Sequence, residues 1–105
     1  MNSDKAGYRV LVSAIFYKTY DFSISDSDKT FFSCQAGIDN RSMREGKEVR
    51  FPIPESGVIE KYKLYDMMIT FSCAVEVMDK IKINSRLYLW SGMFIGEAVV
   101  KEIIP

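Results

Sequence analysis

The sequence of 105 residues contains no histidine and two cysteines. Histidine is the commonest general base and the commonest metal ligand at neutral pH, so its absence excludes catalytic triads and most zinc or iron sites. A structural zinc site needs four thiolate or imidazole ligands, and two cysteines do not supply them. The sequence therefore indicates a protein that is not an enzyme and that holds no metal and no cofactor.

The chain also lacks net charge and long apolar segments. Its 14 basic and 14 acidic side chains cancel, so no long-range field attracts it to nucleic acid or to an anionic membrane. The longest apolar run near the N-terminus, Val10 to Phe16, is interrupted by Ser13 and is far shorter than the roughly 20 residues of a membrane span. We expect a cytoplasmic protein without membrane association.

Leucine is scarce, and β-branched and aromatic residues replace it. The chain has eight valines and eleven isoleucines against four leucines, and it has seven phenylalanines and six tyrosines. Such side chains suit the pleated, half-buried surface of a sheet, whereas leucine and alanine dominate helical cores. The composition predicts an all-β protein.

Alternation of apolar and polar residues locates the strands. In Met67 to Val77 the odd positions are apolar, which predicts a strand of eleven residues. In Tyr8 to Tyr17 the residues Val10, Val12, Ala14 and Phe16 share one face. Further strands are expected at Thr30 to Ala36, Glu48 to Ile53, Lys80 to Ile83, Arg86 to Trp90 and Met93 to Ile104.

Turn-forming residues separate these strands. Ser91-Gly92 predicts a tight hairpin turn, and Asn84-Ser85 predicts a bend within a ribbon. Loops are expected at 23–28, 37–40, 45–46 and 52–57, and Val58 to Tyr65 could hold a single helical turn. Short strands at this spacing predict one domain over residues 1–105. We expect a small closed or partly open antiparallel Greek-key barrel of about six strands.

The two cysteines and the acidic residues offer little chemistry. Cys34 and Cys73 each lie within an apolar strand pattern, which favours two buried thiols over a disulfide. A nucleophilic cysteine would need a neighbouring base. Asp21, Asp26 and Asp28 could present oxygens to calcium, but their spacing fits no EF-hand, and a polar turn is the favoured interpretation.

Two groups of residues are candidates for contact with a partner. Arg41, Arg44, Lys47 and Arg50 place four positive charges within ten residues, which could bind phosphate or an acidic partner, or could form a solvated loop and edge strand. Trp90, Met93 and Phe94 place three large apolar side chains around one hairpin tip, whose turn contains Gly92. These side chains either project outward as an anchor for a protein interface or pack down as a plug of the barrel.

The C-terminal part of the chain resembles the C-terminal β-barrel domain of elongation factor Tu and related translational GTPases. The resemblance covers Leu64 to Val100. It rests on Leu64-Tyr65-Asp66, the alternating run from Met67, the segment Arg86 to Gly92, and Ile95-Gly96-Glu97-Ala98-Val99-Val100. It implies a Greek-key barrel that helps bind aminoacyl-tRNA and partner proteins.

The resemblance carries only part of the family's function. The chain contains no Gly-rich phosphate loop followed by Lys and Ser or Thr, so GTP binding does not follow. The family's tRNA-binding arginine falls on Trp90, which removes the cation that would meet a phosphate. We expect a non-catalytic binding module for a protein partner, or less directly for RNA. The alternatives are a small immunity or inhibitor protein that occludes a toxin or enzyme, and an enzyme that uses carboxylates or a cysteine.

Overall fold

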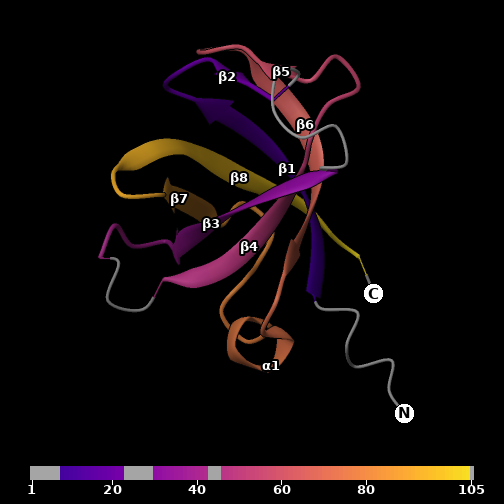
Figure 1. The fold of residues 1–105 in the computed structure, drawn as a ribbon. Coiled ribbons are helices and arrows are strands. Elements are labelled where there is room, and N and C mark those ends of the chain that lie inside the picture. Colours follow the sequence, from indigo (N-terminus) through magenta and orange to yellow (C-terminus); the bar gives the residue numbers. More distant parts are fainter. Residues whose placement is uncertain (1–7, 23–29, 43–45, 105) are drawn as a thin grey trace.

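Six strands of this protein close into an antiparallel barrel (Figure 1). The computed structural model describes residues 8–22, 30–42 and 46–104. The elements are β1 (Tyr8–Phe16), β2 (Tyr20–Asp21), β3 (Phe31–Ile38), β4 (Lys47–Pro52), β5 (Val58–Ile59), β6 (Leu64–Phe71), α1 (Ala74–Val77), β7 (Arg86–Trp90) and β8 (Phe94–Ile104). The barrel confirms the predicted all-β class, and no helix among the described residues has the length and apolar character that a membrane crossing requires.

The strand order is that of a Greek key. Around the barrel the strands run β1-β6-β4-β3-β7-β8, and β8 returns to pair with β1. Strands β3, β4 and β6 are consecutive neighbours, while β1 lies beside β6. The barrel strands β3, β4 and β6 follow one another in sequence and in space, and the last of them returns to pair with β1, which precedes all three. This is the Greek-key pattern. Closure leaves few free strand edges, because each wall strand finds a partner on both sides.

Alternation along the wall strands builds the core. In β1, Val10, Val12, Ala14 and Phe16 are fully buried, as the sequence predicts. Each of the intervening residues points outward, because successive side chains of a strand lie on opposite faces. The same period fills the interior from β6, β7 and β8. The barrel interior is therefore packed with side chains rather than open.

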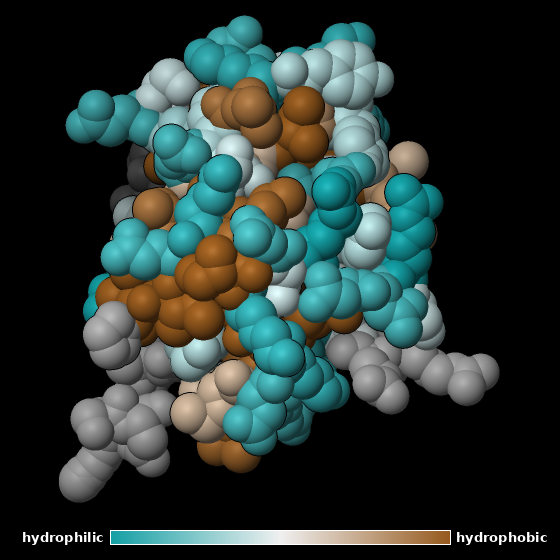
Figure 2. Space-filling model, turned by 180° about the vertical axis from the view of Figure 1, so that it is seen from behind, coloured by the Kyte–Doolittle hydropathy of each residue, from teal (hydrophilic) through white to brown (hydrophobic). Residues whose placement is uncertain are grey.

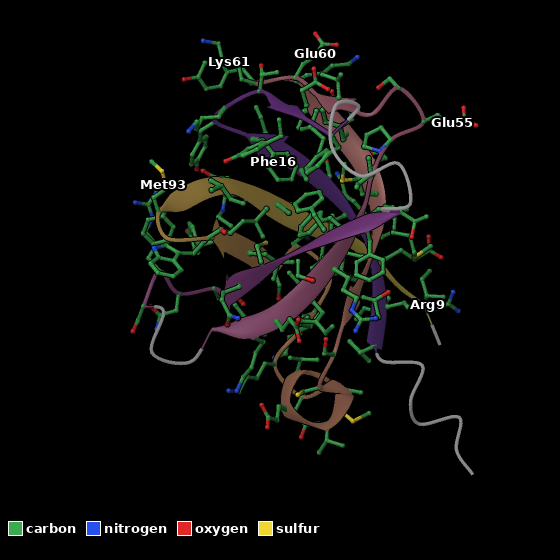
Figure 3. The ribbon with its side chains drawn as sticks, viewed as in Figure 1. Arg9, Phe16, Glu55, Glu60, Lys61 and Met93 are labelled. Atoms are coloured by element: carbon green, nitrogen blue, oxygen red, sulfur yellow. The ribbon has the colours of Figure 1, made fainter. Side chains whose placement is uncertain are left out.

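Aromatic rings close one end of the barrel. The ring of Phe16 lies inside the barrel (Figure 3) and meets Phe51 edge-on, with centroids 5.7 Å apart. Phe32 stacks on Phe51 at 5.3 Å and on Phe22 at 5.2 Å. Tyr20 continues this stack, with its ring 6.4 Å from that of Phe22. Such offset and edge contacts add to the apolar burial of the rings.

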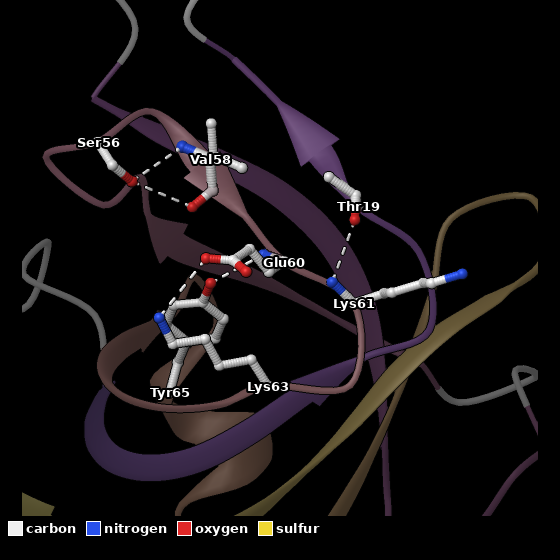
Figure 4. A network of polar contacts seen from close by, with 7 residues as sticks. All are labelled: Thr19, Ser56, Val58, Glu60, Lys61, Lys63 and Tyr65. Atoms are coloured by element: carbon white, nitrogen blue, oxygen red, sulfur yellow. Dashed lines mark hydrogen bonds and ion pairs between the residues drawn. The ribbon is translucent and has the colours of Figure 1, made fainter.

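A two-stranded sheet covers the same end. β2 pairs antiparallel with β5, and the chain then turns into β6 (Figure 4). In this turn the Lys61 N–H donates to Thr19 Oγ1 at 3.2 Å, and the Glu60 N–H donates to the Tyr65 hydroxyl at 2.8 Å. The Tyr62 N–H donates to the Phe16 carbonyl at 2.8 Å. These hydrogen bonds hold the cover on the barrel wall.

The predicted strand Met67 to Val77 is wrong beyond Phe71. Ala74–Val77 forms one helical turn, in which the Met78 N–H donates to the Ala74 carbonyl at 3.0 Å. Among residues 8–22, 30–42 and 46–104, the pairing of β6 with β1 extends no further than Tyr8 and Phe71. The turn instead buries Val77 as a plug for the second end of the barrel.

Four other predictions are corrected. Lys80 to Ile83 forms turns and irregular structure rather than a strand, although Ile81 is buried. Val58 to Tyr65 contains β5 and the start of β6 and has no helical turn. Gly37 and Ile38, predicted as loop, extend β3 because they pair with Tyr88 and Leu87 of β7. Asn84 lies in a turn and has a positive φ of 76°, but this turn precedes β7 and does not bend a longer ribbon, since residues 80–83 form no strand.

Candidate functional site

The hairpin between β7 and β8 lies at one side of the barrel, and Met93 lies at its tip (Figure 3). Trp90 pairs with Phe94, and the Ser91 N–H donates to the Met93 carbonyl at 2.8 Å. Gly92 has a φ of 76°, a left-handed conformation that glycine adopts without steric cost. The predicted tight turn is therefore confirmed.

The side chains of this tip are partly available to solvent. Met93 is 54% exposed, and Trp90 and Phe94 are half-buried. These side chains do not plug the barrel, because the rings of Phe16, Phe32 and Phe51 already fill the end of the barrel that β2 and β5 cover.

Arg41 joins the hairpin from a distant part of the sequence. Its guanidinium carbon lies 5.1 Å from the centre of the Tyr88 ring and 5.6 Å from that of Phe94. A guanidinium over an aromatic face is attracted by the ring quadrupole and remains able to donate hydrogen bonds. We call Arg41, Tyr88, Trp90, Met93 and Phe94 the hairpin face.

A carboxylate beside the hairpin face is held by two donors. The Tyr17 hydroxyl donates to Glu97 Oε2 at 2.7 Å, and Arg86 Nη1 forms an ion pair with Glu97 Oε1. The hydrogen bonds from Tyr17 and Arg86 lower the pKa of the Glu97 carboxyl. Burial, together with the bond to Glu97, raises the pKa of Tyr17 to about 12. Glu97 is thus ionised at neutral pH and is not available as a proton donor.

The predicted basic stretch does not form one patch. Lys47 Nζ pairs with Glu76 Oε1 at 2.9 Å, near the helical turn. The Arg50 guanidinium carbon lies 4.9 Å from the centre of the Phe31 ring. Arg41 belongs to the hairpin face, and Arg44 lies outside the described residues. The three described cations therefore contact three separate parts of the barrel.

The cysteines differ from the prediction of two buried thiols. Cys34 is buried, but Cys73 is exposed because β6 ends before it. Both thiols are free. Burial raises the pKa of Cys34 to about 12, against a smaller opposite effect from a hydrogen bond with the Trp90 backbone. A thiol with this pKa is protonated at neutral pH and is a poor nucleophile.

Of the acidic residues considered for calcium, only Asp21 lies within the described residues. Asp26 and Asp28 lie outside the described residues. Over residues 8–22, 30–42 and 46–104, no three histidine, cysteine, aspartate or glutamate side chains are grouped as metal ligands would be.

Two adjoining depressions lie beside the hairpin. The first has a volume of about 310 Å³ and is lined mainly by aromatic and aliphatic side chains. The second has a volume of about 280 Å³ and is lined mainly by polar side chains together with Trp90. Ser33 and Ser91 line both. The depressions therefore meet along the line between β3 and the hairpin tip.

A separate apolar area lies on the outer faces of β1 and β6, away from the predicted residues. Leu64 is 67% exposed and Met68 is 39% exposed, and they pair with Ile15 and Leu11 of β1. Figure 2 views the molecule from behind and shows apolar patches set among hydrophilic side chains.

Sequence reasoning missed the residues that complete the hairpin face and its surroundings. Tyr88, Glu97 and Tyr17 were not singled out, although the alternation of β7 and β8 places Tyr88 and Glu97 as an outward cross-strand pair. Tyr20 and Phe22 carry no motif, and only the fold stacks them beside Phe32.

Comparison with known proteins assigns the chain to no family. The chain matches no family model, no curated protein and no solved structure. The six-stranded antiparallel barrel agrees with the fold that the resemblance to the elongation-factor domain implies, and a relation to that family stays a prediction.

Proposed function

We propose that this protein is a non-catalytic binding module that contacts a protein partner through the hairpin face. The observation that carries the proposal is the stacking of Arg41 over Tyr88 and Phe94, beside the 54% exposed Met93. Arginine, tyrosine and tryptophan dominate the energetics of protein interfaces, and methionine is enriched there.

The surroundings of the hairpin face favour binding because they hold it in place before a partner arrives. Tyr88 and Trp90 stand on a wall strand that pairs on both sides. Stacking limits the freedom of the Arg41 side chain. Side chains that are ordered beforehand lose less entropy on association, so this face needs fewer contacts to reach a given affinity.

A catalytic role has little support among the described titratable groups. Glu97 is ionised and both of its oxygens accept from Tyr17 or Arg86. Cys34 is protonated at neutral pH and has no imidazole beside it, since the chain contains no histidine. A general acid or base needs a pKa near the working pH, and these groups are shifted away from it.

A protein partner is favoured over RNA because of the charge distribution. The chain has no net charge, and Arg41, Lys47 and Arg50 each contact a different internal partner. RNA binding depends on several cations that meet successive phosphates. Trp90 occupies the position of the tRNA-binding arginine of the elongation-factor domain. We therefore propose a module with a barrel like that of the elongation factor, but without its binding of tRNA.

The test compares the wild-type protein with a paired variant, Arg41→Ala with Met93→Asp, in affinity purification from cell lysate followed by quantitative mass spectrometry. Both substituted side chains are exposed, so the barrel should keep its melting temperature. We expect a defined partner at stoichiometric yield with the wild type and recovery lower by at least about tenfold with the variant.

The matched control is Val75→Asp, because Val75 is 82% exposed on the helical turn at the other end of the barrel. It should recover the partner like the wild type. Equal loss with the control, or no loss with the paired variant, contradicts the proposal. Co-purified nucleic acid would favour RNA instead. A toxin as the partner would favour the inhibitor alternative while keeping the same surface.

A further inference from the structure

Strand β3 has a strand neighbour on only one side over its first half. It pairs with β4 from Phe31 to Ala36, but with β7 only from Gln35 to Ile38. β7 ends at Trp90, where the chain turns into the hairpin. Among the described residues, no strand therefore lies beside 31–34 on the β7 side. This is an opening in an otherwise closed wall.

The direction of the backbone groups follows from the neighbouring hydrogen bonds. In antiparallel pairing, alternate residues point their N–H and C=O groups to opposite sides. The Thr30 carbonyl accepts from the Ile53 N–H at 3.0 Å on the β4 side, and the Asp39 N–H donates to the Arg86 carbonyl at 2.7 Å on the β7 side. By this alternation, Phe31 and Ser33 point their backbone groups into the opening.

The two depressions lie on the two faces of this edge. The first is lined by five apolar or aromatic side chains and by Lys18, Ser33 and Ser91; the apolar ones are those of Tyr20, Phe22, Phe32, Met93 and Ile95. These residues belong to the inner face at the end of the barrel, since Phe32 packs on the core rings of Phe16 and Phe51. A strand laid against the edge would place its inward side chains in this apolar space.

The outward side chains of the same strand would meet different chemistry. The second depression is lined by Ser33, Gln35, Glu48 and Trp90. Ser33, Gln35 and Glu48 are exposed on the outer face of β3 and β4. Polar or basic side chains suit this space, because they can donate to Glu48 and Gln35 or lie on the indole ring.

We propose that the opening beside Phe31 and Ser33 binds an extended peptide segment of a partner protein, whose large apolar residues alternate with polar or basic ones, as an added strand. Main-chain hydrogen bonds to a free edge supply affinity, and pockets for alternate side chains supply specificity. The inference rests on the proposed function, because it specifies which part of a protein partner lies against the hairpin end.

The experiment selects binders from a displayed library of short peptides in which large apolar residues alternate with polar or basic ones. A second library has the same composition but groups its apolar residues in pairs. We expect binders from the first library alone. With a selected peptide bound, the amides of Phe31 and Ser33 should become protected from hydrogen exchange, while those of Phe32 and Cys34 should already be protected in the free protein.

Two matched changes test the backbone hydrogen bonds. Ser33→Pro removes the N–H that points into the opening and should weaken peptide binding about fivefold or more, whereas Ser33→Ala keeps that N–H and should bind like the wild type. Should Ser33→Pro fail to fold, the selected peptide methylated on alternate backbone nitrogens gives the same test with the wild-type protein, since methylation on the facing side abolishes binding.

Three outcomes overturn the proposal. They are the absence of binders from the alternating library, a binder that leaves the Phe31 and Ser33 exchange rates unchanged, and protection of these two amides in the free protein, whether as a monomer or as a dimer of two copies. The test on Arg41 and Met93 does not depend on the conformation of the partner. If the protein passes the test on Arg41 and Met93 but the exchange rates of Phe31 and Ser33 do not change, the proposed function stands and the added strand is wrong.

Discussion

Replacement of Gly96 by alanine tests the closure of the barrel at one point. Gly96 is buried in β8 and pairs with Phe16 of β1. A Cβ added here would lie 2.4 Å from the Ile15 carbonyl oxygen and 3.1 Å from the Phe16 Cα. Both atoms are backbone, so no side-chain rotation relieves the overlap, and β1 or β8 must move.

The expected cost is at the upper end of the range for overpacking, about 3 kcal/mol. The reason is that β1 is paired along its length to β6 as well as to β8, so a shift at Phe16 disturbs both ladders. For a domain of this size, such a loss lowers the melting temperature by roughly 12–24 °C. Thermal and urea unfolding followed by circular dichroism measure it.

Gly92→Ala is the matched control. Nothing lies within 4 Å of a Cβ at Gly92, but its φ is 76°, so this substitution tests conformational cost without overlap, about 1 kcal/mol. A Gly96→Ala protein that melts within about 4 °C of the wild type, or above the Gly92→Ala protein, would refute the close approach of β8 to β1.

Two further predictions concern titration and reactivity. Since the pKa of Tyr17 rises from 10.0 to about 12 on folding, the unfolded chain releases this proton first, and stability is lost as the pH rises from 10 through 12. The free energy of unfolding of the wild type should therefore fall toward that of Tyr17→Phe over this interval. Plots of unfolding free energy against pH that stay parallel for the two proteins would contradict this prediction. Cys34 titrates in both proteins, so its contribution does not change the difference between them. One thiol should react with an aromatic disulfide reagent in the native protein, because Cys73 is exposed and Cys34 is buried, and both should react in denaturant. A Cys73→Ala protein that still reacts while folded would contradict the burial of Cys34.

Prediction from sequence succeeded where a feature depends on a few neighbouring residues. The inward face of β1 follows from alternation at Val10, Val12, Ala14 and Phe16. The hairpin follows from Ser91-Gly92, because only a short list of residues accepts the backbone of a tight turn. These features need no knowledge of the rest of the chain.

The prediction failed where a strand's length depends on its partner. The alternation of β6 continues past Phe71 in the sequence, yet the described pairing of β6 with β1 ends where Tyr8 meets Phe71, and Ala74–Val77 forms a helical turn. Cys73, beyond the end of β6, is exposed. A period of two shows which face a residue would occupy in a strand, but it does not show whether a neighbouring strand is present.

The candidate site divides in the same way. Trp90, Gly92 and Phe94 could be named from the turn, and Arg41 from a run of charge. The sequence did not indicate that Arg41 stacks on Phe94 while Arg50 stacks on Phe31. The opening beside Ser33 arises only because β7 is shorter than β3 where the two meet.

By itself the sequence determined the all-β class, the inward faces of the main strands and the position of the hairpin, because composition, alternation and turn chemistry act over a few residues. Only the tertiary structure decided the order of the strands, the end of β6, the pairing of each cation with a ring, and the free edge of β3. Those features depend on residues far apart in the chain, whose separation disappears only when the barrel closes.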